Sequence, residues 1–208
     1  MNQVRFRWSL LTVFAFIGGF LYTVLTLISW GFFPGPFNPL NNYLSQLGNS
    51  SLNPAGAIFY NMAIFSVGLS LIPMFLGIYK FYSREKASRL LILILFLGIL
   101  NGISIIMSGI FSEDFYEQHV VWSLMIFVTM IPLLFTTNIG LWDYQDFSKP
   151  ISIYGILLGL FDTIFVIYVV LFGTSTGAIL EWITVFAYMS WTILVASRIL
   201  WREKQRNV

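Results

Sequence analysis

The stretch SRLLILILFLGILNGISIIMSGIF (Ser88–Phe111) decides the fold, because after Arg89 it carries no charged residue. About 20 mostly apolar residues are enough for a helix to cross the hydrocarbon core of a bilayer. An open strand would leave its edge amides unpaired in lipid, so such a stretch must be helical. The sequence predicts six transmembrane helices, at residues 8–31, 56–78, 88–111, 119–141, 151–173 and 178–200. The expected fold is therefore an all-α, polytopic six-helix bundle.

The composition supports a membrane protein over its whole length. The chain has 208 residues, of which 58% are hydrophobic and only 10% are charged, whereas a soluble domain has roughly a quarter charged. We therefore expect one transmembrane domain over residues 1–208, with an outer loop at 31–55 and a short polar tail at 201–208. Membrane lipids are the expected partners. A net charge of +2 is too small to indicate a nucleic-acid partner.

The basic residues predict the orientation. All 11 Lys and Arg residues fall before the first span, between the second and third, between the fourth and fifth, or around the end of the sixth. Cytoplasmic loops carry an excess of such residues. We expect a multi-pass protein of the cell (plasma) membrane with both termini cytoplasmic. The loop at 31–55, which has no charged residue, is then outside.

The outer loop at 31–55 has a helical pattern of its own. The apolar residues that follow helical spacing are Leu40, Tyr43, Leu44 and Leu47. Gly48 is a favourable residue just past a helix end, so the pattern predicts a short amphipathic helix on the outer membrane surface. The alternative is that the loop only covers the bundle as a lid. Asn53 and Pro54 are predicted to cap and begin the second span.

The turn FSEDFYEQHVVW (Phe111–Trp122) combines three carboxylates with the chain's single histidine. Acidic residues at a helix start complement the helix dipole, so capping is one interpretation. A binding site for a cation or a headgroup amine is another, and catalysis is a third. Glu181 opens the sixth span on the same side. The candidate ligand-binding residues are Ser45, Glu113, Asp114, Glu117, His119, Ser123 and Glu181.

A single histidine argues against metal chemistry. Zinc hydrolases use three protein ligands that generally include histidine, so no metal is expected and the multi-His ceramidase-type membrane hydrolases are a poor match. One histidine at a surface turn also disfavours haem, and no cofactor is expected. Ser45 or Ser123 could still form a triad-like set with His119 and an acid.

Two polar residues lie at mid-depth in predicted spans. Asp162 and Asn101 stand near the centres of the fifth and third spans. A carboxyl at that depth is costly and often marks function. An Asp162–Asn101 hydrogen bond between helices is one interpretation, and a proton or ligand pathway is the other. Six glycines indicate close helix packing: Gly18, Gly19, Gly98, Gly102, Gly155 and Gly159.

Two segments resemble a known family. YLSQLGNSSLNPAG in the outer loop and SGIFSEDFYEQH at the third-to-fourth turn carry short motifs. The matching positions are Ser45, Leu47, Gly48, Gly109, Ile110, Phe111, Glu113, Asp114 and His119. The chain is similar at these positions to a prokaryotic integral-membrane family, domain-of-unknown-function family 998, and more loosely to DRAM-type six-helix proteins. The resemblance implies the six-helix topology and brings no activity with it.

Three functions remain open from the sequence. We expect a non-enzymatic protein that binds a lipid or small amphiphile at its outer face. The alternatives are a proton-coupled transporter that uses Asp162, and an outward-facing membrane hydrolase or transferase that uses His119 with the neighbouring acids. The oligomeric state and the identity of the ligand do not follow from the sequence.

Overall fold

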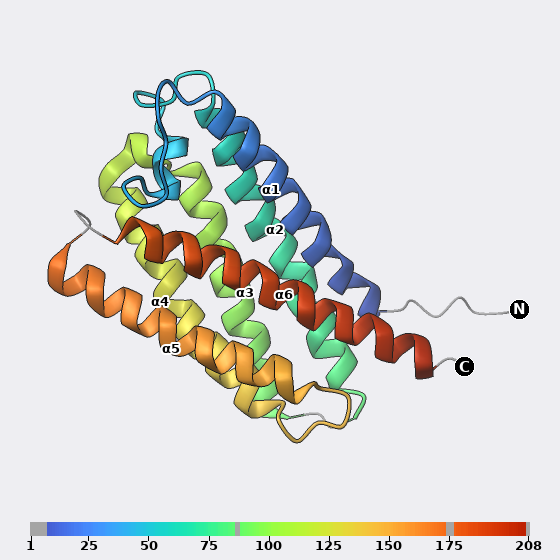
Figure 1. Ribbon diagram of the computed structural model, residues 1–208. Helices are drawn as coiled ribbons and strands as arrows, with labels where there is room; N and C mark the ends of the chain where they lie inside the picture. Colours follow the sequence, from blue (N-terminus) through green and yellow to red (C-terminus); the bar gives the residue numbers. More distant parts are fainter. Residues whose placement is uncertain (1–7, 86–87, 174–176, 207–208) are drawn as a thin grey trace, which may run out of the picture.

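The computed structural model describes residues 8–85, 88–173 and 177–206, and within them it contains six long helices and no strand (Figure 1). All six are long and apolar enough to cross a membrane, which confirms the predicted fold. The helices are α1 (Phe14–Gly31), α2 (Ala57–Tyr82), α3 (Arg89–Ile110), α4 (Tyr116–Gly140), α5 (Lys149–Phe172) and α6 (Ala178–Arg206). Short 3-10 helices precede α1 (η1, Trp8–Val13) and α4 (η3, Glu113–Phe115), and a third lies between α1 and α2 (η2, Leu44–Gly48).

Two helices continue beyond their predicted inner ends. α2 reaches Tyr82 and α6 reaches Arg206. Residues 201–206 of the predicted polar tail are therefore helical, while 207–208 lie outside the described residues. The last turns of α2 and α6 contact the loop between α4 and α5, through Tyr82 with Phe147 and Arg206 with Asp146. Hydropathy alone contains no information about these contacts.

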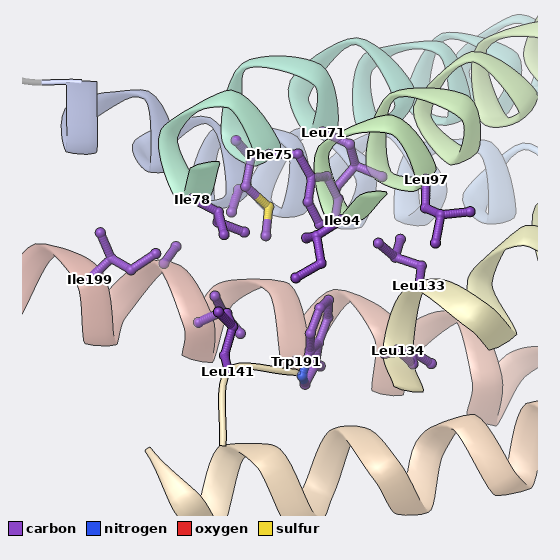
Figure 2. Close-up of a cluster of buried hydrophobic side chains, with 14 of the residues drawn as sticks. Leu71, Phe75, Ile78, Ile94, Leu97, Leu133, Leu134, Leu141, Trp191 and Ile199 are labelled. Atoms are coloured by element: carbon purple, nitrogen blue, oxygen red, sulfur yellow. The ribbon is translucent and has the colours of Figure 1, made fainter. Parts of the chain in front are cut away.

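The buried core lies where α2, α3, α4 and α6 meet. α6 crosses between α1 and α5 and contacts both, as well as α2 (Figure 1). Figure 2 shows Phe75, Ile94, Leu133 and Trp191 pointing into the shared interior. The Trp191 indole donates a hydrogen bond to Asn138 Oδ1 at 3.1 Å, so the ring is fixed in orientation as well as buried.

Glycines allow the closest helix contacts, as predicted. At the crossing of α2 and α3, a Cβ built on Gly68 would lie 2.6 Å from the carbonyl oxygen of Gly102. A Cβ on Gly18 would lie 2.8 Å from that of Ser70, between α1 and α2. Small residues let helix backbones approach in this way.

The end of the bundle that carries the basic residues, called the inner end after the predicted orientation, is closed by ion pairs. Asp146, in the loop between α4 and α5, is 3% exposed and is bound by the Arg202 and Arg206 side chains. Arg84 pairs with Glu203 at 2.9 Å. Within the described ranges every ion pair lies at this end, and none involves a carboxylate of the opposite end.

Candidate functional site

The loop between α1 and α2 folds back over the other end of the bundle, called the outer end after the predicted orientation (Figure 1). Its 3-10 helix η2 buries Leu44 and Leu47 completely, whereas Leu40 is exposed. The predicted short helix is therefore present and ends at Gly48, but its buried leucines pack onto the bundle, so it does not lie on the membrane surface as predicted. The loop is a lid, because its apolar side chains point down into the bundle. We call residues 32–56 the lid.

Asn53 anchors the lid to α1. Its side-chain amide donates to the carbonyl and hydroxyl oxygens of Ser29 and to the carbonyl of Leu47, all within 3.1 Å. The predicted helix cap at Asn53 is wrong, because α2 begins at Ala57 with Gly56 as its N-cap. The Asn53 amide is satisfied by these long-range bonds, and its Oδ1 accepts from the Gly56 amide.

Three carboxylates of the helix ends hold the lid in place. Ser45 Oγ donates to Glu113 Oε1 at 2.7 Å. The amide and hydroxyl of Ser50 both donate to Asp114 Oδ1 at 2.9 Å. The Leu44 amide donates to Glu181 Oε2 at 2.6 Å. The acidic turn therefore binds the lid, in addition to starting α4.

His119 is oriented by a backbone carbonyl and not by an acid. Its Nδ1 lies 2.9 Å from the carbonyl oxygen of Phe111, which can only accept, so Nδ1 carries the proton. In the neutral ring, Nε2 then accepts from Ser123 Oγ at 3.1 Å. Ser123 Oγ also lies 3.3 Å from Ser108 Oγ, so the two hydroxyls and the imidazole form a continuous chain of contacts. The carboxylate of a Ser-His-Asp triad is absent from this arrangement.

Beneath the lid lies a cavity of about 70 Å³. That volume is several times what one water needs, and the cavity has enough polar partners to hold one. Its polar lining residues come from the lid and from the outer turns of four helices: Ser45, Asn61, Ser108, His119, Ser123 and Glu181. Its apolar lining lies mostly deeper in the same helices and includes Ile64, Val67, Ile105, Ile126, Met130 and Val185. The cavity is polar toward the lid and apolar toward the membrane centre.

The predicted site residues divide between the cavity and the lid surface. Ser45, His119, Ser123 and Glu181 line the cavity. The structure places the other three candidates elsewhere: Glu113 behind Ser45, Asp114 on the lid at Ser50, and Glu117 exposed on α4.

The sequence reasoning missed five lining residues that carry a polar group: Tyr22, Tyr60, Asn61, Ser108 and Tyr188. Asn61 and Ser108 had a usable signal, since each is a polar residue within the outer turns of an otherwise apolar span. No comparable signal distinguishes Tyr22 and Tyr60 from interfacial tyrosines.

The two mid-membrane polar residues do not pair with each other. Asn101 donates to Thr129 Oγ1 at 3.0 Å and accepts from the Tyr188 hydroxyl at 3.0 Å. Both oxygens of Asp162 are buried without a hydrogen-bond partner among the described residues. The predicted Asp162–Asn101 bond is therefore not formed, and Asp162 does not line the cavity.

Comparison with known proteins gives one match. The family model described as "Protein of unknown function (DUF998)" matches residues 16–198. No curated protein and no solved structure matches the chain. In the described part of the chain, no group of three or more His, Asp or Glu side chains is arranged to hold a metal ion.

Proposed function

The chain belongs to the DUF998 family, whose description assigns no activity, and we propose that it binds a lipid or another small amphiphile in the cavity beneath the lid. The cavity carries this proposal, because its polar groups cluster under the lid and its apolar groups lie toward the bilayer centre. An amphiphile in the outer leaflet has the same polarity gradient. Binding pockets are commonly apolar with a few convergent polar groups, and they enclose about 300–1,000 Å³. The cavity of about 70 Å³ therefore accommodates the headgroup and the nearest carbons, and the rest of the chain must lie outside it.

A groove on the lipid-facing side of α2 gives an apolar tail a place to lie. It is lined by exposed apolar residues of α2, including Ile58, Met62 and Phe65, and by Gly109 of α3. Asn61 belongs to both this groove and the cavity. The Asn61 side chain, which donates to the Gly48 carbonyl at 3.1 Å, therefore lies where the two spaces are nearest in sequence position.

The proposal takes the basic end as cytoplasmic. The positive-inside rule then places the lid on the outer side of the plasma membrane. Ligand would reach the cavity from the outer leaflet or from the outer aqueous phase. Neither alternative function has comparable support, because Asp162 adjoins no described cavity and His119 lacks a carboxylate partner.

A pair of matched valine variants tests the proposal. Val185→Phe adds a ring inside the cavity, whereas Val170→Phe makes the same change on the exposed, lipid-facing surface of α5. Native mass spectrometry of the purified full-length protein measures the amphiphile that it retains. We expect retained amphiphile on the unaltered protein and on Val170→Phe, and its loss from Val185→Phe. Equal retention by both variants would show that the ligand does not occupy the cavity.

A further inference from the structure

The carboxylate of Glu181 has no basic side chain to balance it. Glu181 is 9% exposed and lines the cavity. All 11 Lys and Arg residues of the sequence belong to the segments at the other end of the spans. A buried carboxylate in a protein is normally paired, or else it takes up a proton and is neutral. The described part of the chain provides no Lys or Arg counterion for Glu181, so an ionised carboxylate there needs a partner from outside the chain.

His119 is the one remaining base at this end, and it does not serve Glu181. Its Nδ1 faces the Phe111 carbonyl and its Nε2 faces Ser123 Oγ. The groups that do bond to Glu181 are backbone amides of the lid, at Leu44 and Ser45. Amide dipoles stabilise a carboxylate but leave its net charge in place.

Aromatic residues lie next to this charge. Tyr22 and Tyr60 both line the cavity, with ring centroids 6.3 Å apart in an edge-to-face arrangement. Aromatic faces attract cations.

The phenol of Tyr43, in the lid, would interact with a negative charge at Glu181. Burial, with a further contribution from the negative charge of Glu181, raises the pKa of Tyr43 to about 12. A cation near Glu181 would relieve this charge, whereas an anionic headgroup would add to it.

We propose that the ligand of the cavity is a cationic amphiphile, with an alkylammonium nitrogen beside Glu181 and an apolar chain that passes Asn61 into the groove on α2. The proposal rests on the proposed function and specifies its ligand class. The ammonium balances the buried carboxylate, and the tyrosine rings contribute attraction that is independent of hydrogen bonding. Anionic lipids are excluded from the cavity by the same charge.

A series of probes with one chain length and different headgroups tests the charge. Dodecylammonium, dodecyltrimethylammonium and dodecanol are titrated into the purified full-length protein in nanodiscs, each below its micellar concentration. Calorimetry measures Kd. We expect at least one of the two ammonium probes to bind at least tenfold more tightly than dodecanol. Tighter binding of the primary amine indicates recognition by hydrogen bonds, and tighter binding of the trimethylated probe indicates recognition by the tyrosine rings.

Two isosteric substitutions provide the matched comparison. Glu181→Gln removes the buried charge and keeps an acceptor for the Leu44 amide. Glu117→Gln makes the same change at an exposed carboxylate of the same end. We expect Glu181→Gln to weaken ammonium binding at least tenfold and Glu117→Gln to leave it unchanged. If Glu181→Gln does not fold, the probe series on the unaltered protein still decides the question.

The outcomes separate this inference from the proposed function. If dodecanol binds as tightly as the ammonium probes and Val185→Phe weakens all three, the cavity is an amphiphile site without charge preference. Glu181 is then neutralised by a proton, and the inference is wrong. If no probe binds, or if Val185→Phe changes no affinity, the proposed function itself fails.

Discussion

The sharpest structural prediction concerns Gly68, at the crossing of α2 and α3. A Cβ at this position would lie 2.6 Å from the carbonyl oxygen of Gly102 and 2.7 Å from the amide nitrogen of Ile106. Both neighbours are backbone atoms of α3, so no side-chain rotation relieves the contact. Since ordinary Cβ contacts begin near 3.4 Å, the two helices must separate by about 0.8 Å.

The expected cost of Gly68→Ala combines two opposing effects. Overpacking a well-packed interior costs about 1–3 kcal/mol, and rigid backbone neighbours place this site at the upper end. Replacing glycine by alanine within a helix returns about 1 kcal/mol. The net loss of stability is about 2 kcal/mol, which for a chain of this size lowers the Tm by roughly 4–8 °C.

Thermal unfolding in detergent, followed by tryptophan fluorescence, measures this shift. Gly31→Ala is the control, because a Cβ there has no neighbour within 4 Å. We expect Gly31→Ala to leave the Tm unchanged or to raise it slightly. A Tm for Gly68→Ala equal to or above that of the unaltered protein would refute the close approach of α2 and α3.

Three further predictions address buried polar groups and orientation. Asp162→Leu should raise the Tm, since both carboxyl oxygens lack partners among the described residues and an unsatisfied buried polar group costs about 1–3 kcal/mol. Asn101→Leu should lower the Tm, because a buried tyrosine hydroxyl loses its acceptor. A lower Tm for both variants would contradict the assignment of Asp162 as unpartnered. Asp146→Asn should destabilise the protein by about 2 kcal/mol in chemical unfolding, because two arginines lose a buried carboxylate; an unchanged midpoint would show that these pairs contribute nothing. In the cysteine-free chain, Ser50→Cys should react with an impermeant maleimide added to intact cells and Ser148→Cys should not; the reverse pattern would invert the topology.

The fold was predictable because its main signal is local. An apolar run such as Ser88–Phe111 has one stable structure in lipid, whatever its neighbours are. The extension of α6 to Arg206 was not predictable in the same way. It depends on Asp146, which lies in a loop some 60 positions earlier in the chain.

The site was predictable where residue type alone indicated function. Ser45, His119 and Glu181 stood out as polar groups at the outer end of an apolar chain, and they do line the cavity. The fold of the lid was not predictable. The Leu44 amide is held by Glu181, 137 positions away, and this contact, with Asn53 bound to Ser29, holds η2 inward. Local spacing favoured a surface helix because it contains no information about these distant acceptors.

The carboxylates at the two ends of the bundle have different partners, because the basic residues lie at one end only. At the inner end, Asp146 and Glu203 are buried but paired with arginines. At the outer end, Glu113 and Glu181 accept hydrogen bonds from neutral donors only in the described structure. The Lys and Arg residues that predict the orientation lie in the segments at the other end of the spans. For the same reason, no basic side chain of the described residues pairs with a carboxylate at the cavity. The proposed charge preference of the cavity and the predicted orientation in the membrane therefore rest on the same feature of the sequence.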